Sequence, residues 1–182
     1  MSIEEEENNG LVFESGALNV HNGEEENPRF AAVARVITNK LVRSVSFRDT
    51  MDMIWRPSRG VSIEQIGDMC FMLQLFHESD ISRVLQDGPW SFDQNLVVIS
   101  RVGERDMPLE VELNHAEFWV QIHNLPLSFM TETVAIGVGR YLGRLVKIDE
   151  RTLKGKSKEF VRIRVSIDVR SAQKRRTQLR EE

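Results

Sequence analysis

Cysteine is almost absent from this chain of 182 residues, since Cys70 is the only one. A disulfide within the chain needs two cysteines and a zinc knuckle needs three, so neither can form. The four histidines, His21, His77, His115 and His123, are scattered without a second ligand at metal-binding spacing. We therefore expect no bound metal.

Long apolar runs are also missing, because no stretch approaches the ~20 residues that a membrane-spanning helix requires. Residues 1–7 carry four glutamates where a secretory signal would be basic. Residues 1–27 hold eight glutamates and no lysine or arginine, a composition typical of a disordered acidic tail. We expect an intracellular protein of the nucleus or cytoplasm that does not contact a membrane.

The sequence contains no complete nucleotide-binding or catalytic motif. Residues 155–157 (GKS) end like a phosphate-binding loop, but Glu150 stands where that motif requires its earlier glycine. Gly137 and Gly139 resemble part of a dinucleotide fingerprint, but Leu142 occupies the third glycine position. No Ser/His/Asp or paired-carboxylate arrangement can be nominated, so the sequence predicts a non-enzymatic protein without cofactor or small-molecule substrate.

Positive charge is concentrated near the C-terminal end, although the formal net charge of the whole chain is −4. Residues 28–100 hold eight basic and eight acidic side chains, whereas residues 140–182 hold fourteen and six. The last quarter of the chain is therefore where a polyanion would bind, although a basic solvated surface without a ligand has the same composition.

Hydrophobic periodicity in the first half predicts a β-α-β-β-α-β order, with the first helix starting at a cap on Ser46 and burying Phe47, Met51, Ile54 and Trp55. The expected strands are 34–38, 61–67, 70–77 and 96–101, and the second helix is 79–87. This is the order of the ferredoxin-like fold, which RNA-recognition motifs share. Residues 28–101 are predicted to form this first unit.

Residues 118–170 repeat the first four elements and form the predicted second unit. The expected elements are strands at 118–124, 145–149 and 160–169 and a helix at 131–142 that buries Val134, Val138, Tyr141 and Leu142. A connector (102–117) separates the units and a basic tail (171–182) follows. The predicted fold class is α+β, one ferredoxin-like unit followed by a partial β-α-β-β unit. The residues expected in the two cores include Trp55, Phe71, Leu73, Trp90, Val98, Val120, Ile122 and Ile163.

The two predicted sheets differ in how their faces are filled. In the last strand, apolar residues alternate with Phe160, Arg162 and Arg164, so one face is core and the other is solvated. Both faces of the first sheet are apolar, since residues 96–99 are Leu-Val-Val-Ile. We expect the second unit or a partner chain, including another copy in a homo-oligomer, to cover its second face.

The solvated face of the second unit is the candidate binding site. RNA-recognition motifs stack bases on aromatics of the first and third strands and hold phosphates with Arg or Lys. Residues 120–125 and 158–165 are similar to these strand signatures, although Gln121, Arg162 and Val165 replace aromatics. Fewer aromatics and more charge predict low-specificity binding of RNA or single-stranded DNA. The predicted site comprises Trp119, Gln121, His123, Lys154, Lys156, Lys158, Phe160, Arg162 and Arg164. A protein-interaction or self-assembly module is the alternative.

A set of short motifs adds a resemblance to one known family. The motifs are Trp55-Arg56-Pro57 before Gly60-Val61, Val84-Leu85 before residues 88–93 (GPWSFD), residues 118–122 (FWVQI) with Asn124-Leu125-Pro126, Gly139, Leu142-Gly143, and Val146, Ile148 and Asp149. In their order and spacing, residues 30–170 resemble a plant domain of unknown function. That domain is common in proteins derived from LINE-type retrotransposons and usually precedes a CCHC zinc knuckle. The resemblance implies kinship with retroelement proteins, but the single cysteine leaves no knuckle here.

Overall fold

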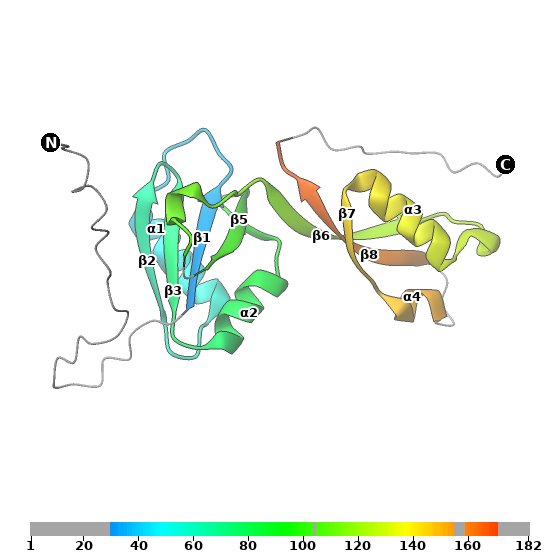
Figure 1. The fold of residues 1–182 in the computed structure, drawn as a ribbon, viewed down its shortest axis with the longest axis horizontal. Helices are drawn as coiled ribbons and strands as arrows, with labels where there is room; N and C mark the ends of the chain where they lie inside the picture. The colour runs from blue at the N-terminus through cyan, green and yellow to red at the C-terminus, as the bar shows by residue number, and fades with distance from the viewer. Residues whose placement is uncertain (1–29, 104, 155–158, 171–182) are drawn as a thin grey trace, which may run out of the picture.

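The computed structural model describes residues 30–103, 105–154 and 159–170 of the protein, which form two antiparallel sheets and four α-helices (Figure 1). The predicted acidic tail (1–27) and basic tail (171–182) lie outside the described residues. None of the helices within the described ranges has the length and apolar character needed to cross a membrane.

The first unit contains a five-stranded sheet in the order β2-β3-β1-β5-β4, with every pair antiparallel. Its elements are β1 (Phe30–Val36), α1 (Ser44–Trp55), β2 (Val61–Gly67), β3 (Cys70–Leu75), α2 (Glu78–Gln86), β4 (Trp90–Phe92) and β5 (Asn95–Val102). They follow the expected order, except that β4 was not predicted. This three-residue strand forms a hairpin with β5, which turns at Asp93 and Gln94, both at positive φ.

Helix α1 differs from its prediction at its N-terminal end and in one of its buried residues. It begins at Ser44 rather than after Ser46, and Arg43 at the N-cap makes no capping hydrogen bond through its side chain. Phe47, Met51 and Trp55 are buried as predicted, but Ile54 is 43% exposed. The buried residues recur at every fourth position, so the buried stripe rotates around the helix and leaves Ile54 at its edge.

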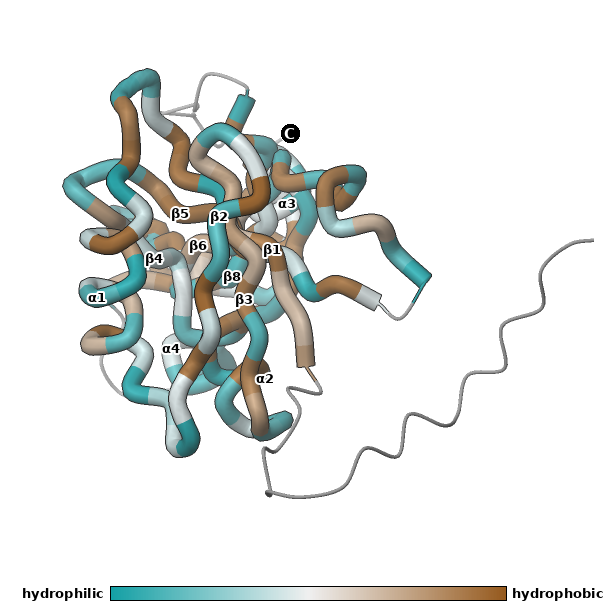
Figure 2. The backbone as a smooth tube through the Cα atoms, turned by 90° about the vertical axis from the view of Figure 1, so that its left-hand side faces the viewer, coloured by the Kyte–Doolittle hydropathy of each residue, from teal (hydrophilic) through white to brown (hydrophobic). Residues whose placement is uncertain are grey.

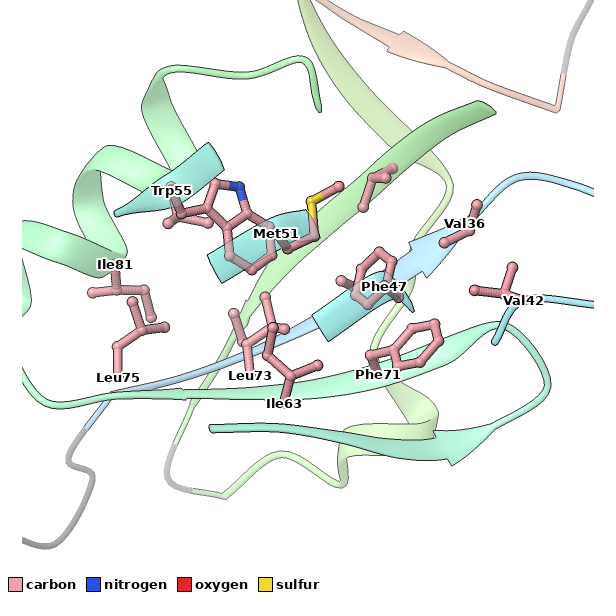
Figure 3. Close-up of a cluster of buried hydrophobic side chains, with 14 residues drawn as sticks. Val36, Val42, Phe47, Met51, Trp55, Ile63, Phe71, Leu73, Leu75 and Ile81 are labelled. Carbon is pink, nitrogen blue, oxygen red and sulfur yellow. The ribbon is translucent and has the colours of Figure 1, made fainter. Parts of the chain in front are cut away.

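Both helices of the first unit pack on one face of its sheet and enclose the larger core (Figure 3). Phe47 of α1 stacks on Phe71 of β3, with ring centroids 4.1 Å apart. Trp90 is half-buried at the edge of this core, where its indole N–H donates to the Val84 carbonyl at 2.7 Å. Of the residues expected in the cores, Trp55, Phe71, Leu73, Val98 and Ile163 are buried, whereas Trp90, Val120 and Ile122 are half-buried.

The second face of the first sheet is covered by the connector and by β6. Val33 of β1 and Val98 of β5 form a buried cluster with Leu113 and Ala116, and Phe118 packs against it. Figure 2 shows the hydrophobic colouring along β1 and β5, the two strands of the first sheet that contribute buried residues to this cluster. Of the two covers expected for this face, the second unit or a partner chain, the structure has the start of the second unit there, together with the connector.

The second unit contains a three-stranded sheet in the order β6-β8-β7. Its elements are β6 (His115–His123), the 3-10 turn η2 (Leu127–Phe129), α3 (Glu132–Leu142), β7 (Arg144–Ile148), α4 (Glu150–Lys154) and β8 (Phe160–Asp168), and a further 3-10 turn, η1 (Pro108–Glu110), lies in the connector. Strand β6 starts inside the predicted connector, and α4 was not predicted. Helix α3 packs on one face of the sheet, over Val161, Ile163 and Val165 of β8.

Of the four residues predicted to face the core from α3, Val138 is buried and Val134 and Leu142 are partly buried against it, but Tyr141 is not. Ala135, Val138 and Gly139 are buried and Leu142 is partly buried, but Tyr141 is 44% exposed. At 100° per residue, Tyr141 lies well to the side of the stripe that these four residues define. A Cβ on Gly139 would lie 2.7 Å from the Leu145 Cδ1, so the missing side chain permits close packing of α3 on β7.

Candidate nucleic-acid interface

The outer face of the second sheet is the face that α3 leaves uncovered. Strand pairing places Trp119 opposite Arg164, Gln121 opposite Arg162, and His123 opposite Phe160. Directly opposed residues in antiparallel strands point to the same side of the sheet. The structure therefore brings together six of the residues predicted for the site, all on β6 and β8.

The Trp119 indole lies beside two arginines of β8. The guanidinium carbon of Arg162 is 4.4 Å from the centre of the Trp119 ring system, and that of Arg164 is 5.7 Å away. Both distances are within the range of cation–π attraction, which favours arginine over a flat indole. Arg162 is only half-buried, so it presents a cation stacked on an aromatic ring to solvent.

Arg164 is much less accessible than the sequence predicted. The alternation of β8 placed Arg164 on a solvated face, but Arg164 and the next residue on that face, Ser166, are only 9% and 3% exposed. The first unit covers these two side chains, because residues of β5 and of the segment before β4 line the same pocket as Arg164 and Ser166. The outer face is thus open toward Phe160 and covered toward Ser166.

Glu117 lies beside the buried Arg164 guanidinium. The Glu117 Oε2 is 2.8 Å from the Arg164 Nε, close enough for an ion pair. The Nε–H is not directed at that oxygen, and neither Nε nor Nη2 finds a hydrogen-bond partner among the described residues. Burying a guanidinium costs free energy unless its donors are satisfied, so Arg164 is only partly compensated.

The open end of the outer face carries two aromatic rings. The His123 and Phe160 rings lie 5.4 Å apart, centroid to centroid, at a tilt of 44°. His123 also shares a hydrogen bond of 3.0 Å with the Gln121 side chain. Gln121 and His123 are exposed and Phe160 is half-buried, so all three are accessible to a ligand.

Of the three lysines predicted for the site, the structure describes only Lys154. Lys154 ends α4, is exposed and pairs with Glu150 one turn earlier. The hydrogen bond to Glu150 raises the pKa of the Lys154 ammonium, and the nearby carboxylate offsets part of its charge. Lys156 and Lys158 lie outside the described residues.

Two basic residues of the outer face were missed from sequence. Arg144 of β7 is opposite Ser166, and Lys147 is opposite Arg164, so both point to the outer face and both are exposed. Arg144 lies just before the predicted strand (145–149), and a register shift between Leu145 and Lys147 explains the omission of Lys147. Simple alternation places Lys147 on the inner side with Leu145, whereas an irregularity of one residue reverses its direction.

No group of three or more His, Cys, Asp or Glu side chains within the described ranges is arranged to hold a metal ion. The chemistry of the outer face is instead that of cations and flat rings. Its arginines and Lys147 can attract phosphates, and its rings and the Arg162 guanidinium can stack with planar groups.

Comparison with known proteins locates one family match. Residues 24–102 match the family model described as Domain of unknown function (DUF4283). The matched residues end with β5, so the outer face of the second sheet lies beyond them. A search of curated proteins found no match to the chain.

Proposed function

We propose that the protein is a non-enzymatic binder of RNA or single-stranded DNA, and that the outer face of the second sheet is its binding surface. The observation that carries the proposal is the Arg162 guanidinium held 4.4 Å from the Trp119 ring on an accessible sheet face. Such a pair offers a nucleic acid both a positive charge and a planar surface, the two features common to single-strand binders.

Two stacking positions follow from this geometry. One is the exposed side of the Arg162 guanidinium, which Trp119 supports from beneath. The other is Phe160 with its neighbour His123. Phe160 and Arg162 are two residues apart on β8, about 7 Å along the strand. Each can therefore hold its own base, and stacking contributes roughly 1 to 3 kcal/mol per base.

Phosphate contacts would come from the basic residues beside these positions. Arg144 and Lys147 lie on β7, next to β8 on the same face, and both are exposed. Stacking and phosphate contacts are largely independent of base identity, so the proposed binding is of low sequence specificity.

In this proposal the first unit has a ferredoxin-like fold and a structural role, and it does not bind the nucleic acid. Two features favour the ferredoxin-like assignment. Helices α1 and α2 pack on the same face of the sheet, and β3 lies between β2 and β1, which is the split β-α-β arrangement. The other face of the sheet is occupied by β6 and the connector. Kinship with plant retroelement proteins is part of this proposal and rests on the motifs shared with that family.

A protein-interaction module is the second candidate, because several large apolar side chains of the first unit are exposed. Leu41, Val45 and Met53 are 90%, 62% and 70% exposed, the last two on α1. Apolar side chains left exposed in this way are found on many protein-binding surfaces. Salt separates the two candidates, since a phosphate binder loses affinity steeply with added salt whereas an apolar interface does not.

The test is titration of labelled single-stranded RNA and DNA, followed by fluorescence anisotropy at two salt concentrations. Converting both Arg162 and Lys147 to Glu should abolish binding without unfolding the protein, because neither side chain is in the core. Arg164 is unsuitable for this purpose, since a buried charge reversal would destabilise the fold. Unchanged affinity in the double variant would leave the interaction module as the better proposal.

A further inference from the structure

A pocket of about 280 Å³ lies where the two units meet. The first unit contributes an apolar wall that includes Leu85, Pro89 and Ile99. The second unit contributes polar side chains from all three strands of its sheet. Neither unit forms this pocket alone, and it is separate from the stacking positions at Phe160 and Arg162.

Positive charge predominates among the side chains that line the pocket. Three arginines reach it, Arg101 from the first unit and Arg144 and Arg164 from the second, and Glu117 is the one carboxylate among the lining residues. The Arg101 guanidinium is held by two hydrogen bonds, of 2.9 and 2.6 Å, to the Glu78 carboxylate. Glu78 therefore occupies both Nη groups of Arg101, and Arg144 and Arg164 are the lining arginines left to bind a ligand.

Arg164 favours binding of an anion in the pocket, because its buried guanidinium has hydrogen-bond donors without acceptors among the described residues. Its side chain lines the pocket and is nine-tenths buried. Glu117 Oε2 lies 2.8 Å from its Nε, but neither Nε nor Nη2 has a hydrogen-bond partner within the part of the chain that the structure describes. Unsatisfied donors on a buried guanidinium are costly, and an oxyanion can satisfy several of them at once. Ser166 and Ser100 add hydroxyl groups to the lining.

We propose that this pocket binds a phosphate group, with its oxygens at Arg144 and Arg164 and its attached apolar portion against the first unit. Arginine is suited to this role because its planar donors match two phosphate oxygens. The volume is sufficient for a phosphate ion and a small substituent. This inference goes beyond the proposed function, since a phosphate ion would occupy the pocket whether or not a strand binds the outer face.

Occupancy has a structural consequence. Arg144 and Arg164 belong to the second unit and the apolar wall belongs to the first, so a ligand held by both adds a contact between the units to the apolar cluster around Val33 and Val98. A ligand that binds only the folded, joined state raises its stability in proportion to its occupancy. Phosphate should therefore raise the melting temperature more than chloride does at equal ionic strength.

The test is a titration of the full chain with inorganic phosphate at constant ionic strength, monitored by the NMR signal of the Trp90 indole N–H, which lies in the pocket lining. A saturable shift is expected. Arg144→Gln should weaken phosphate binding at least tenfold, whereas Lys147→Gln should change it less than twofold. Both variants remove one exposed positive charge from β7, but only Arg144 lines the pocket.

Three outcomes decide the proposal. Selective loss in Arg144→Gln supports it, while an absent shift, or equal weakening in both variants, overturns it. A short oligonucleotide added to the phosphate-bound protein identifies the source of the group. Displacement of phosphate assigns the pocket to a nucleic-acid strand, and its retention assigns it to a free phosphate or small phosphorylated molecule. Loss of oligonucleotide binding with phosphate binding intact would contradict the proposed function alone.

Discussion

Arg162 lies over the indole of Trp119, with its guanidinium carbon 4.4 Å from the ring centre, and the two residues belong to neighbouring strands that pair antiparallel. Gln121 is the residue directly opposite Arg162, so the contact runs diagonally across the β6–β8 pair. Diagonal neighbours in a sheet are within reach of long and aromatic side chains. The contact orders a long cation that would otherwise sample many rotamers, so less entropy is lost when a ligand binds it.

The Arg162→Lys variant separates the planar surface from the charge. Lysine keeps the positive charge but lacks the flat guanidinium on which a base can stack. We expect affinity for single-stranded RNA to fall about fivefold, equivalent to roughly 1 kcal/mol, the lower end for one stacked base. Anisotropy titration measures this change, and Arg151→Lys on exposed α4 is the matched control. Equal affinity in both variants would show that Arg162 acts through charge alone.

Phe160→Ala removes the second proposed stacking surface. We expect affinity to fall by about 1 to 3 kcal/mol if a base stacks on this ring. The slope of affinity against salt should stay the same, because no phosphate contact is removed. Tyr141→Ala is the control, since it deletes an exposed aromatic ring from α3, on the opposite side of the sheet. A change in slope at unchanged low-salt affinity would argue against stacking at Phe160.

The sequence predicted elements and buried residues correctly where the periodicity of apolar residues within one strand or helix determines which side chains are buried. It located β2, most of β8 and the buried residues Phe47, Met51 and Trp55, because each element places its apolar residues at one period. It also indicated that the first sheet needed a second cover, because both phases of residues 96–99 are apolar.

The sequence was uninformative where two segments distant in the chain meet. Arg164 alternates with the apolar residues of β8, so the sequence predicts that it is solvated; it is buried because it packs against the first unit. Lys147 has the wrong phase, and only the register shift in β7 brings it to the outer face. The pocket at the junction combines residues from α2 to β8, so local periodicity could not reveal it. The most specific parts of the candidate sites are therefore the least visible in sequence.

Two glycines of α3 provide a matched test of packing between helix and sheet. Gly139→Ala would place a Cβ 2.7 Å from the Leu145 Cδ1 and 3.1 Å from its Cβ, so α3 and β7 must move apart. We expect the free energy of unfolding to fall by about 1 to 3 kcal/mol, as for other overpacked cores. Gly137→Ala meets nothing within 4 Å and should be stabilising by up to ~1 kcal/mol through helix propensity. Urea denaturation of both variants measures the two effects, and equal stability would contradict the close approach of α3 to β7.

Asp80 predicts how stability depends on pH. This carboxylate of α2 is buried, accepts hydrogen bonds from the Ser58 backbone N–H at 2.9 Å and hydroxyl at 2.6 Å, and pairs with Arg83 at 3.1 Å. Burial acts to raise its pKa, but the hydrogen bonds from Ser58 and the charge of Arg83 together lower it below 3.8, its ordinary value. Folding therefore favours the ionised form.

The sign of the pH effect follows from that lowered pKa. Stabilisation by the Asp80 carboxylate is fully present above its ordinary pKa and is lost as the pH falls through the lower pKa of the folded state. Asp80→Asn should lower the free energy of unfolding by about 2 kcal/mol at neutral pH, because the Ser58 and Arg83 donors lose a charged acceptor. The difference between wild type and variant should shrink toward pH 2, measured by urea denaturation across that range. Asp87→Asn, at the exposed C-cap of α2, is the control for loss of a carboxylate from α2 and should change the free energy of unfolding at neutral pH much less than Asp80→Asn does. A difference that stays constant down to pH 2 would mean that Asp80 stabilises α2 by packing rather than through its charge.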